Sequence, residues 1–186
     1  LRLGHSPAQA LEAAADQSRL DERFATCAIV VIDVVTGQLT YANAGHLPPL
    51  IVPAVNRDQP TVTPAQLTTL DPTGPLLSVL ARGWRLGTAS LEPGQVLLLV
   101  TDGLLEARSS NGEEFGVEGV CMALSQATIR DVDTAVTALT AAAHAYADDY
   151  NRDDVTVLAV MRDLPSAPTA GDAVPTTETA QTMQLR

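Results

Sequence analysis

The chain has 186 residues, of which 46% are hydrophobic, and this length and composition predict one domain with one sizeable core. Its 22 acidic residues outnumber 11 basic residues, all of them arginine, and the resulting net charge of -11 argues against nucleic acid or an anionic membrane as a partner. The two cysteines, Cys27 and Cys121, follow no disulfide or zinc spacing and are expected to be buried reduced thiols. The chain has no stretch of about 20 apolar residues and no signal sequence, so we expect a cytoplasmic protein.

The first half of the chain predicts a short helix followed by a β-hairpin. Ser6 suits an N-cap, Pro7 suits the first helical position, and the alanine-rich continuation predicts a helix to about Gln17. Residues 43–49 carry Asn, Gly and Pro, which favour a tight, fixed loop. The predicted strands before and after that loop are apolar and β-branched: 24–32, 38–42 and 50–52.

The second half predicts a buried central strand over Val96–Val100, because five apolar residues follow a Pro-Gly turn. Two further strands and two helices surround it in the sequence, namely strands over 84–91 and 155–161 and helices over 116–126 and 132–147. Residues 163–186 are dominated by Pro, Thr, Ala and Gly and are predicted to form a disordered tail.

Two aspartates stand at the ends of predicted core strands. Asp102 directly follows the central strand, and Asp153 lies shortly before the last one. If these strands are antiparallel neighbours, both carboxylates reach the same sheet edge and can bind one hard cation or a pair of them. Mg²⁺ or Mn²⁺ fits such oxygen ligands, and Gly103 allows close approach of the backbone. Taken singly, each motif is also compatible with an ordinary turn or a solvated loop.

The order of several motifs is more specific than any one of them. In chain order they are Phe24-Ala25-Thr26, residues 36–49 (TGQLTYANAGHLPP), Gly74-Pro75-Leu76-Leu77, Leu91-Glu92-Pro93-Gly94, residues 101–108 (TDGLLEAR) and Asp153-Asp154-Val155-Thr156. With these motifs the chain resembles the metal-dependent protein phosphatase (PPM, protein phosphatase 2C-like) family, in its SpoIIE-like bacterial branch. The resemblance implies an α+β fold, a two-layer antiparallel β-sandwich flanked by helices, with residues 1–162 as a partial phosphatase domain.

The resemblance also implies a function. Members hydrolyse phosphoserine or phosphothreonine in proteins, typically a phosphorylated anti-anti-sigma factor, with water activated by a binuclear Mn²⁺ or Mg²⁺ centre. Asp102 and Asp153 match ligand positions, while Gly103 and Asp154 are expected beside the ligands. Arg108 can face an incoming phosphate or, equally, pair on the surface with Glu106 or Glu113.

His46 has two interpretations. It can act as a general acid toward the leaving serine oxygen, or it can hold neighbouring backbone in a packed loop.

One departure from the family pattern limits the functional expectation. The family's N-terminal G-D-x-x-G-H-G segment, which supplies further metal ligands, does not occur in these 186 residues. We therefore expect a domain that lacks its N-terminal part, with half of the metal site, weak metal affinity and little activity on its own. The alternative is a non-catalytic remnant or a regulatory module that binds a phosphoprotein.

Overall fold

The computed structural model describes residues 4–17, 23–55, 60–127, 129, 131–147 and 154–163, together with the backbone of 179–185. The chain divides into two compact units, one formed by residues 1–49 and 69–91 and the other by residues 50–68 and 92–186. Each unit combines an antiparallel sheet with helices, which confirms the predicted α+β class. Composition predicted a single core, whereas the structure has two hydrophobic clusters, because each sheet packs against helices of its own unit.

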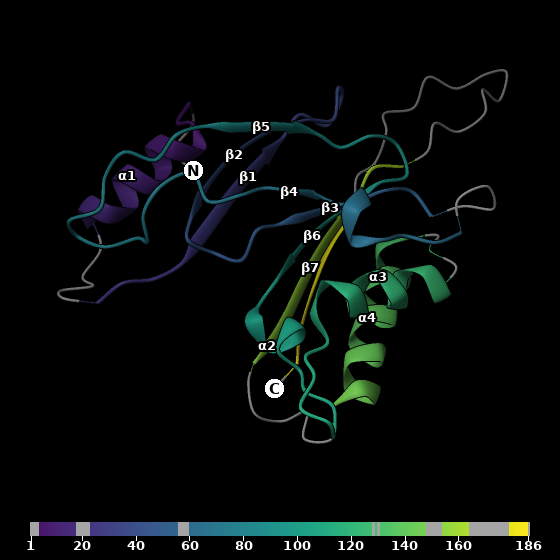
Figure 1. Ribbon diagram of the computed structural model, residues 1–186. Helices are drawn as coiled ribbons and strands as arrows, with labels where there is room; N and C mark the ends of the chain where they lie inside the picture. The colour runs from purple at the N-terminus through teal and green to yellow at the C-terminus, as the bar shows by residue number, and fades with distance from the viewer. Residues whose placement is uncertain are drawn as a thin grey trace, which may run out of the picture. The chain divides into compact units, whose positions relative to one another are not determined.

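The first unit consists of a three-stranded sheet and one helix (Figure 1). The strands are ordered β1-β2-β5 and are antiparallel. Their bounds are β1 (Cys27–Ile32), β2 (Gln38–Ala44) and β5 (Gly87–Ser90), and the helix is α1 (Pro7–Gln17). The turn between β1 and β2 is closed by Asp33, whose carboxylate accepts the backbone N–H groups of Val35 and Thr36 at 2.9 Å each. The predicted helix and hairpin are thus confirmed.

Helix α1 begins with a reciprocal cap. Ser6 N–H donates to Gln9 Oε1 at 2.9 Å, and Gln9 N–H donates to Ser6 Oγ at 3.3 Å. The helix buries Leu11 and Ala15 in a small cluster that also contains Trp84. This contact, which removes apolar surface from water, holds α1 on the sheet.

The second unit contains a five-stranded sheet in the order β4-β3-β6-β7-β8. The strands are β3 (Leu50–Val52), β4 (Thr68–Thr69), β6 (Val96–Val100), β7 (Val155–Met161) and β8 (Thr179–Leu185). The helices are α2 (Asp102–Leu105), α3 (Gly116–Gln126), α4 (Val132–Tyr146) and the short 3-10 helix η1 (Pro64–Gln66). Strands β3, β6 and β7 and helices α3 and α4 confirm the sequence predictions, whereas α2 was not expected.

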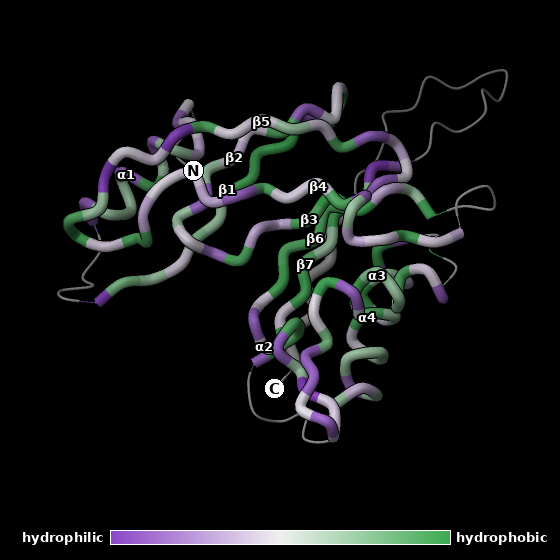
Figure 2. The backbone as a smooth tube through the Cα atoms, in the orientation of Figure 1, coloured by the Kyte–Doolittle hydropathy of each residue, from purple (hydrophilic) through white to green (hydrophobic). Residues whose placement is uncertain are grey.

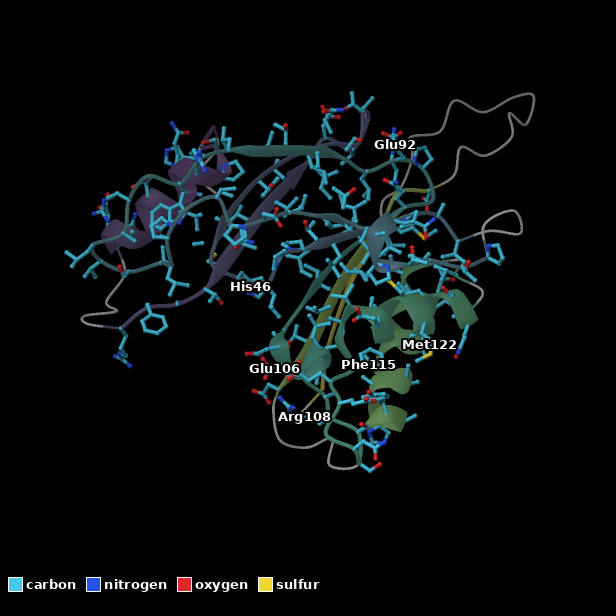
Figure 3. The ribbon with its side chains drawn as sticks, viewed as in Figure 1. His46, Glu92, Glu106, Arg108, Phe115 and Met122 are labelled. Carbon is cyan, nitrogen blue, oxygen red and sulfur yellow. The ribbon has the colours of Figure 1, made fainter. Side chains whose placement is uncertain are left out.

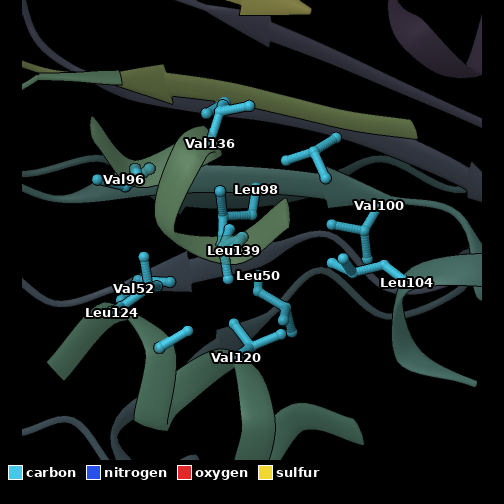
Figure 4. Packing of buried hydrophobic residues seen from close by; sticks show 14 of the residues in the cluster. Leu50, Val52, Val96, Leu98, Val100, Leu104, Val120, Leu124, Val136 and Leu139 are labelled. Atoms are coloured by element: carbon cyan, nitrogen blue, oxygen red, sulfur yellow. The ribbon is translucent and has the colours of Figure 1, made fainter. Parts of the chain in front are cut away.

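The core of the second unit lies between the sheet and helices α3 and α4, which lie side by side (Figure 1). Along β7, Val155, Val157 and Ala159 are buried in alternation, as one face of a strand requires. Leu98 of β6 and Leu139 of α4 are fully buried in the same cluster (Figure 4). Colouring by hydropathy shows apolar β6 and β7, with hydrophilic residues where β6 leads into α2 (Figure 2). The rigid sheet therefore ends in a polar edge.

The predicted disordered tail requires a correction over part of its length. Residues 179–185 form β8, which pairs antiparallel with β7 from Val155↔Leu185 to Met161↔Thr179. The physical reason is that the outer edge of β7 offers a row of backbone donors and acceptors, which this pairing satisfies. Residues 164–178 lie outside the described part of the chain.

Candidate metal centre

The C-terminal end of β6 and the N-terminal end of β7 meet at one end of the second unit's sheet. The two strands pair antiparallel from Val96↔Met161 to Val100↔Val157, and Thr101 N–H extends the ladder by donating to Thr156 C=O at 3.1 Å. Asp102 begins α2 immediately after this position, and Asp154 immediately precedes β7. The strand arrangement on which the predicted site depends is thus confirmed. Asp153 itself lies outside the described residues.

Thr101 links the two strand ends through its side chain. Thr156 N–H donates to Thr101 Oγ1 at 2.8 Å, and the Thr101 hydroxyl donates to Asp154 C=O at 3.0 Å. Thr101 is also the N-cap residue of α2, yet its hydroxyl makes no capping bond to that helix. The side chain therefore serves the neighbouring strand instead of its own helix.

Asp102 is exposed at the start of α2, and its Oδ1 accepts the Gly103 N–H at 3.0 Å. No ion pair engages Asp102 among the residues that the structure describes. An exposed carboxylate without a competing cation is a suitable ligand for Mg²⁺ or Mn²⁺, because these ions prefer carboxylate oxygens and water. Asp102 thus supplies the kind of oxygen ligand that such an ion prefers. Within the described residues, however, no group of three or more His, Cys, Asp or Glu side chains could hold a metal.

Arg108 lies on the loop after α2 and is engaged on the surface (Figure 3). Its guanidinium pairs with Glu114 and also donates to Gly112 C=O at 3.1 Å. The backbones of Arg108 and Glu114 form an isolated antiparallel bridge, which explains why Glu114 is the partner instead of Glu106 or Glu113. A role in phosphate binding stays a prediction, and it requires this exposed ion pair to open.

His46 belongs to the first unit, where a buried asparagine fixes its backbone. Asn43 is fully buried at the end of β2. Its Oδ1 accepts His46 N–H at 2.8 Å, and its Nδ2 donates to His46 C=O at 3.0 Å and to Leu70 C=O at 3.2 Å. Thr73 Oγ1 accepts the Asn43 backbone N–H at 3.0 Å. One side chain thereby ties together the loop after β2 and the segment around Leu70.

The imidazole of His46 is half-buried, and its Nδ1 lies 3.3 Å from Thr26 Oγ1. The loop is tight at Gly45, whose φ of +69° favours glycine and whose Cβ position would overlap the side chain of Leu76. The loop is packed, as the second interpretation expects, but the imidazole contacts the Thr26 hydroxyl, and Asn43 holds the neighbouring backbone. The general-acid interpretation stays a prediction.

Both cysteines are free thiols, but only Cys121 is buried as expected, whereas Cys27 is partly exposed. Burial raises the pKa of Cys27, and burial together with the nearby Glu118 carboxylate raises the pKa of Cys121. Neither is therefore an activated nucleophile. Within the described ranges, no helix has both the length and the apolar character needed to cross a bilayer.

Comparison with known proteins identifies the family. The model of the family described as Stage II sporulation protein E (SpoIIE) matches residues 1–163. The chain belongs to the SpoIIE family. This assignment confirms the SpoIIE-like, PPM-type phosphatase resemblance.

The relatives found are larger than this chain. It is 33% identical over 94 residues to Protein IcfG of Synechocystis sp. (strain ATCC 27184 / PCC 6803 / Kazusa), a match that covers 50% of this chain and 13% of IcfG. It is 27% identical to the crystal structure of the RsbU and RsbW domains of Rv1364c from Mycobacterium tuberculosis, with a TM-score of 0.67 over 88% of this chain and 44% of that one. The chain thus spans less than half the length of these relatives.

The fold is also that of the phosphatase domain of SpoIIE from Bacillus subtilis, solved from a crystal presoaked in Mn. The TM-score is 0.60 at 14% identity, over 87% of this chain and 67% of that one. This similarity confirms the predicted PP2C-like phosphatase fold.

Two structurally important residues were not singled out from the sequence. Thr101 stands directly before Asp102, and a hydroxyl residue at a strand end was the available signal. Asn43 opens the predicted loop, where its type suggested turn chemistry, whereas the structure buries it completely. Both act through hydrogen bonds to distant backbone, which local patterns do not reveal.

Proposed function

We propose that this SpoIIE-family domain is the metal-binding part of a protein serine/threonine phosphatase, with Asp102 and Asp153 as metal ligands. The observation that supports the proposal is the pairing of β6 with β7, which brings Asp102 and Asp154, the residue after Asp153, to one polar end of the sheet. When bound, Mn²⁺ or Mg²⁺ ions would acidify water for attack on phosphorus and neutralise charge that develops on the phosphoryl oxygens.

The chain's own residues have distinct tasks in this proposal. Asp102 provides an exposed carboxylate at the rigid end of β6, and Gly103 N–H orients it through Oδ1. Asp154 belongs to the segment that adjoins Asp153, and the Thr101 hydroxyl fixes its carbonyl. Arg108 would meet a phosphate only by leaving Glu114, and His46 would protonate the leaving oxygen as a general acid.

The proposed substrate is a phosphorylated protein, in the family-typical case an anti-anti-sigma factor. Because the G-D-x-x-G-H-G segment is not in these 186 residues, two carboxylates leave the coordination shell of an ion with about six oxygens incomplete. We therefore expect weak metal binding and little Mn²⁺-dependent hydrolysis of p-nitrophenyl phosphate by this chain alone. The same incompleteness favours, as a second candidate, a module that binds a phosphoprotein without turnover.

The test compares two proteins: this chain, and the same chain preceded by an in-frame G-D-x-x-G-H-G segment from its own gene or from a relative. Phosphate release from a phosphoserine peptide is measured with and without Mn²⁺. We expect turnover in the extended protein and a loss of roughly 100-fold or more in Asp102→Ala, since even residues that only orient ligands are worth about 10–100-fold. Asp133→Ala, an exposed aspartate in the first turn of α4, is the matched control.

Each outcome decides between the candidates. Turnover that survives Asp102→Ala would overturn the ligand assignment. Phosphopeptide binding without release by the extended protein would favour the binding module. Robust turnover by the 186-residue chain that disappears in Asp102→Ala would retain the phosphatase and overturn the argument from the missing ligands.

A further inference from the structure

The junction of β6 and α2 makes unusual use of a threonine. In a regular antiparallel pair, facing residues can exchange two backbone hydrogen bonds. At the Thr101 and Thr156 positions only one is a backbone bond, from Thr101 N–H to Thr156 C=O at 3.1 Å. The Thr101 carbonyl has already turned into the helix, where it accepts the Leu104 N–H at 3.1 Å. The returning bond from Thr156 N–H goes to Thr101 Oγ1 at 2.8 Å instead.

The hydroxyl thus takes the place of the missing backbone acceptor. Because a hydroxyl can accept and donate at the same time, it also donates to Asp154 C=O at 3.0 Å. A threonine at an N-cap normally accepts an N–H of its own helix, and here that bond is absent. The side chain is therefore committed to the start of β7.

The bonds between the Thr101 hydroxyl and the start of β7 restrict the backbone next to Asp102. Asp102 follows Thr101 directly, and the Asp154 carbonyl that Thr101 holds lies one residue after Asp153. Since consecutive Cα atoms are only about 3.8 Å apart, fixing Thr101 against Asp154 restricts the backbone at Asp102 and at the start of β7. A backbone N–H or C=O that loses a partner at this edge would turn toward water and shift this backbone.

We propose that Thr101 is a positioning residue of the metal site: its hydroxyl holds the backbone of Asp154, at the start of β7, against the strand end that bears Asp102. The inference rests on the proposed metal-dependent function. It assigns to Thr101 no contact with metal or substrate. Serine should retain the function, whereas valine, which has nearly the same shape and no hydroxyl, should lose it.

The experiment is a titration of the ¹⁵N-labelled chain with Mn²⁺, following paramagnetic broadening of the amide signals of residues 101–103 and 154–156. This readout reports the metal directly and requires no turnover. We expect Thr101→Val to need about 10-fold or more additional Mn²⁺ for half-maximal broadening, and Thr101→Ser to stay within about twofold of the wild type. Thr140→Val is the matched control, because it deletes a buried hydroxyl that bonds to Val136 C=O at 2.9 Å within α4.

The possible failures are distinguishable. If Asp102→Ala abolishes broadening while Thr101→Val matches the wild type, the role of Thr101 is overturned and the metal site stands. If broadening is unchanged in Asp102→Ala, the proposed metal site fails and the role of Thr101 fails with it. If Thr101→Val does not fold, Thr101→Ala and Thr101→Ser decide, because only the alanine variant should lose affinity. Equal loss in Thr140→Val would show a general effect of destabilisation and would also overturn the proposal.

Discussion

Replacement of Asn43 by alanine should strongly destabilise the first unit. The substitution removes three side-chain hydrogen bonds, two with the backbone of His46 and one with Leu70 C=O. Each such bond contributes about 1 kcal/mol net, and a buried group left without a partner costs about 1–3 kcal/mol. Leu70 is 1% exposed, so water has little access to its freed carbonyl. We therefore expect a loss of about 3–5 kcal/mol, a large share of the about 5–15 kcal/mol typical of a domain.

The assay is urea denaturation followed by the fluorescence of Trp84. It is the only tryptophan of the chain, it is 5% exposed, and it lies in the same cluster as Ala42 and Ala44, the neighbours of Asn43. The signal therefore reports the first unit. Asn111→Ala, in an exposed turn, is the control and should change the unfolding free energy by less than about 0.5 kcal/mol.

Two further variants make the test of Asn43 specific. Asn43→Asp should destabilise at least as much as Asn43→Ala at pH 7. In the wild type, Asn43 Nδ2 donates to the carbonyl oxygens of His46 and Leu70, whereas aspartate would direct a negative charge at them. Thr73→Val removes the acceptor of the Asn43 N–H together with a long bond from the Thr73 hydroxyl to Asn43 C=O at 3.5 Å, and it should cost about 1 kcal/mol. An Asn43→Ala loss below about 1 kcal/mol, or an aspartate variant more stable than the alanine variant, would refute the reasoning.

Three other predictions concern the loops and thiols. Gly45→Ala should lower the melting temperature more than Gly112→Ala, because both glycines have positive φ but only Gly45 would bring a Cβ into Leu76; equal shifts would contradict the overlap. Arg108→Ala should change the unfolding free energy by no more than about 1 kcal/mol, since its ion pair with Glu114 is exposed, and a larger loss in urea denaturation would contradict this. Iodoacetamide should label Cys121 more slowly in the native protein than in urea, because the raised pKa of this thiol lowers the fraction of reactive thiolate. Labelling is followed by mass spectrometry, and equal rates would contradict the prediction.

Most secondary structure was predictable because the local signals are strong. Ser6 and Pro7 predicted the start of α1, and five consecutive apolar residues predicted β6. The same kind of signal failed for β8, whose pairing is satisfied by the distant β7 backbone and not by local preference. Short α2 was missed because four residues are too few for a helical pattern.

The position of Asp102 at a strand end was predictable from the sequence, whereas the contacts around it were not. The position of Asp102 after an apolar run identifies a strand end from sequence alone. The partner of Arg108 could not be identified, because Glu106, Glu113 and Glu114 are all near in sequence and the backbone bridge selects Glu114. Asn43 and Thr101 form hydrogen bonds with residues 27 and 53 positions away, and no periodicity of the sequence indicates such pairs.

The junction at Thr101 also limits how this domain can vary. The same residue, Thr101, extends the β6 ladder and accepts the first hydrogen bond of α2, and it alone separates strand from helix. One inserted residue would have to break either the contact with Thr156 or the bond from Leu104. We expect variation in length to collect instead in the exposed turn around Asn111, where the chain can lengthen without moving either strand.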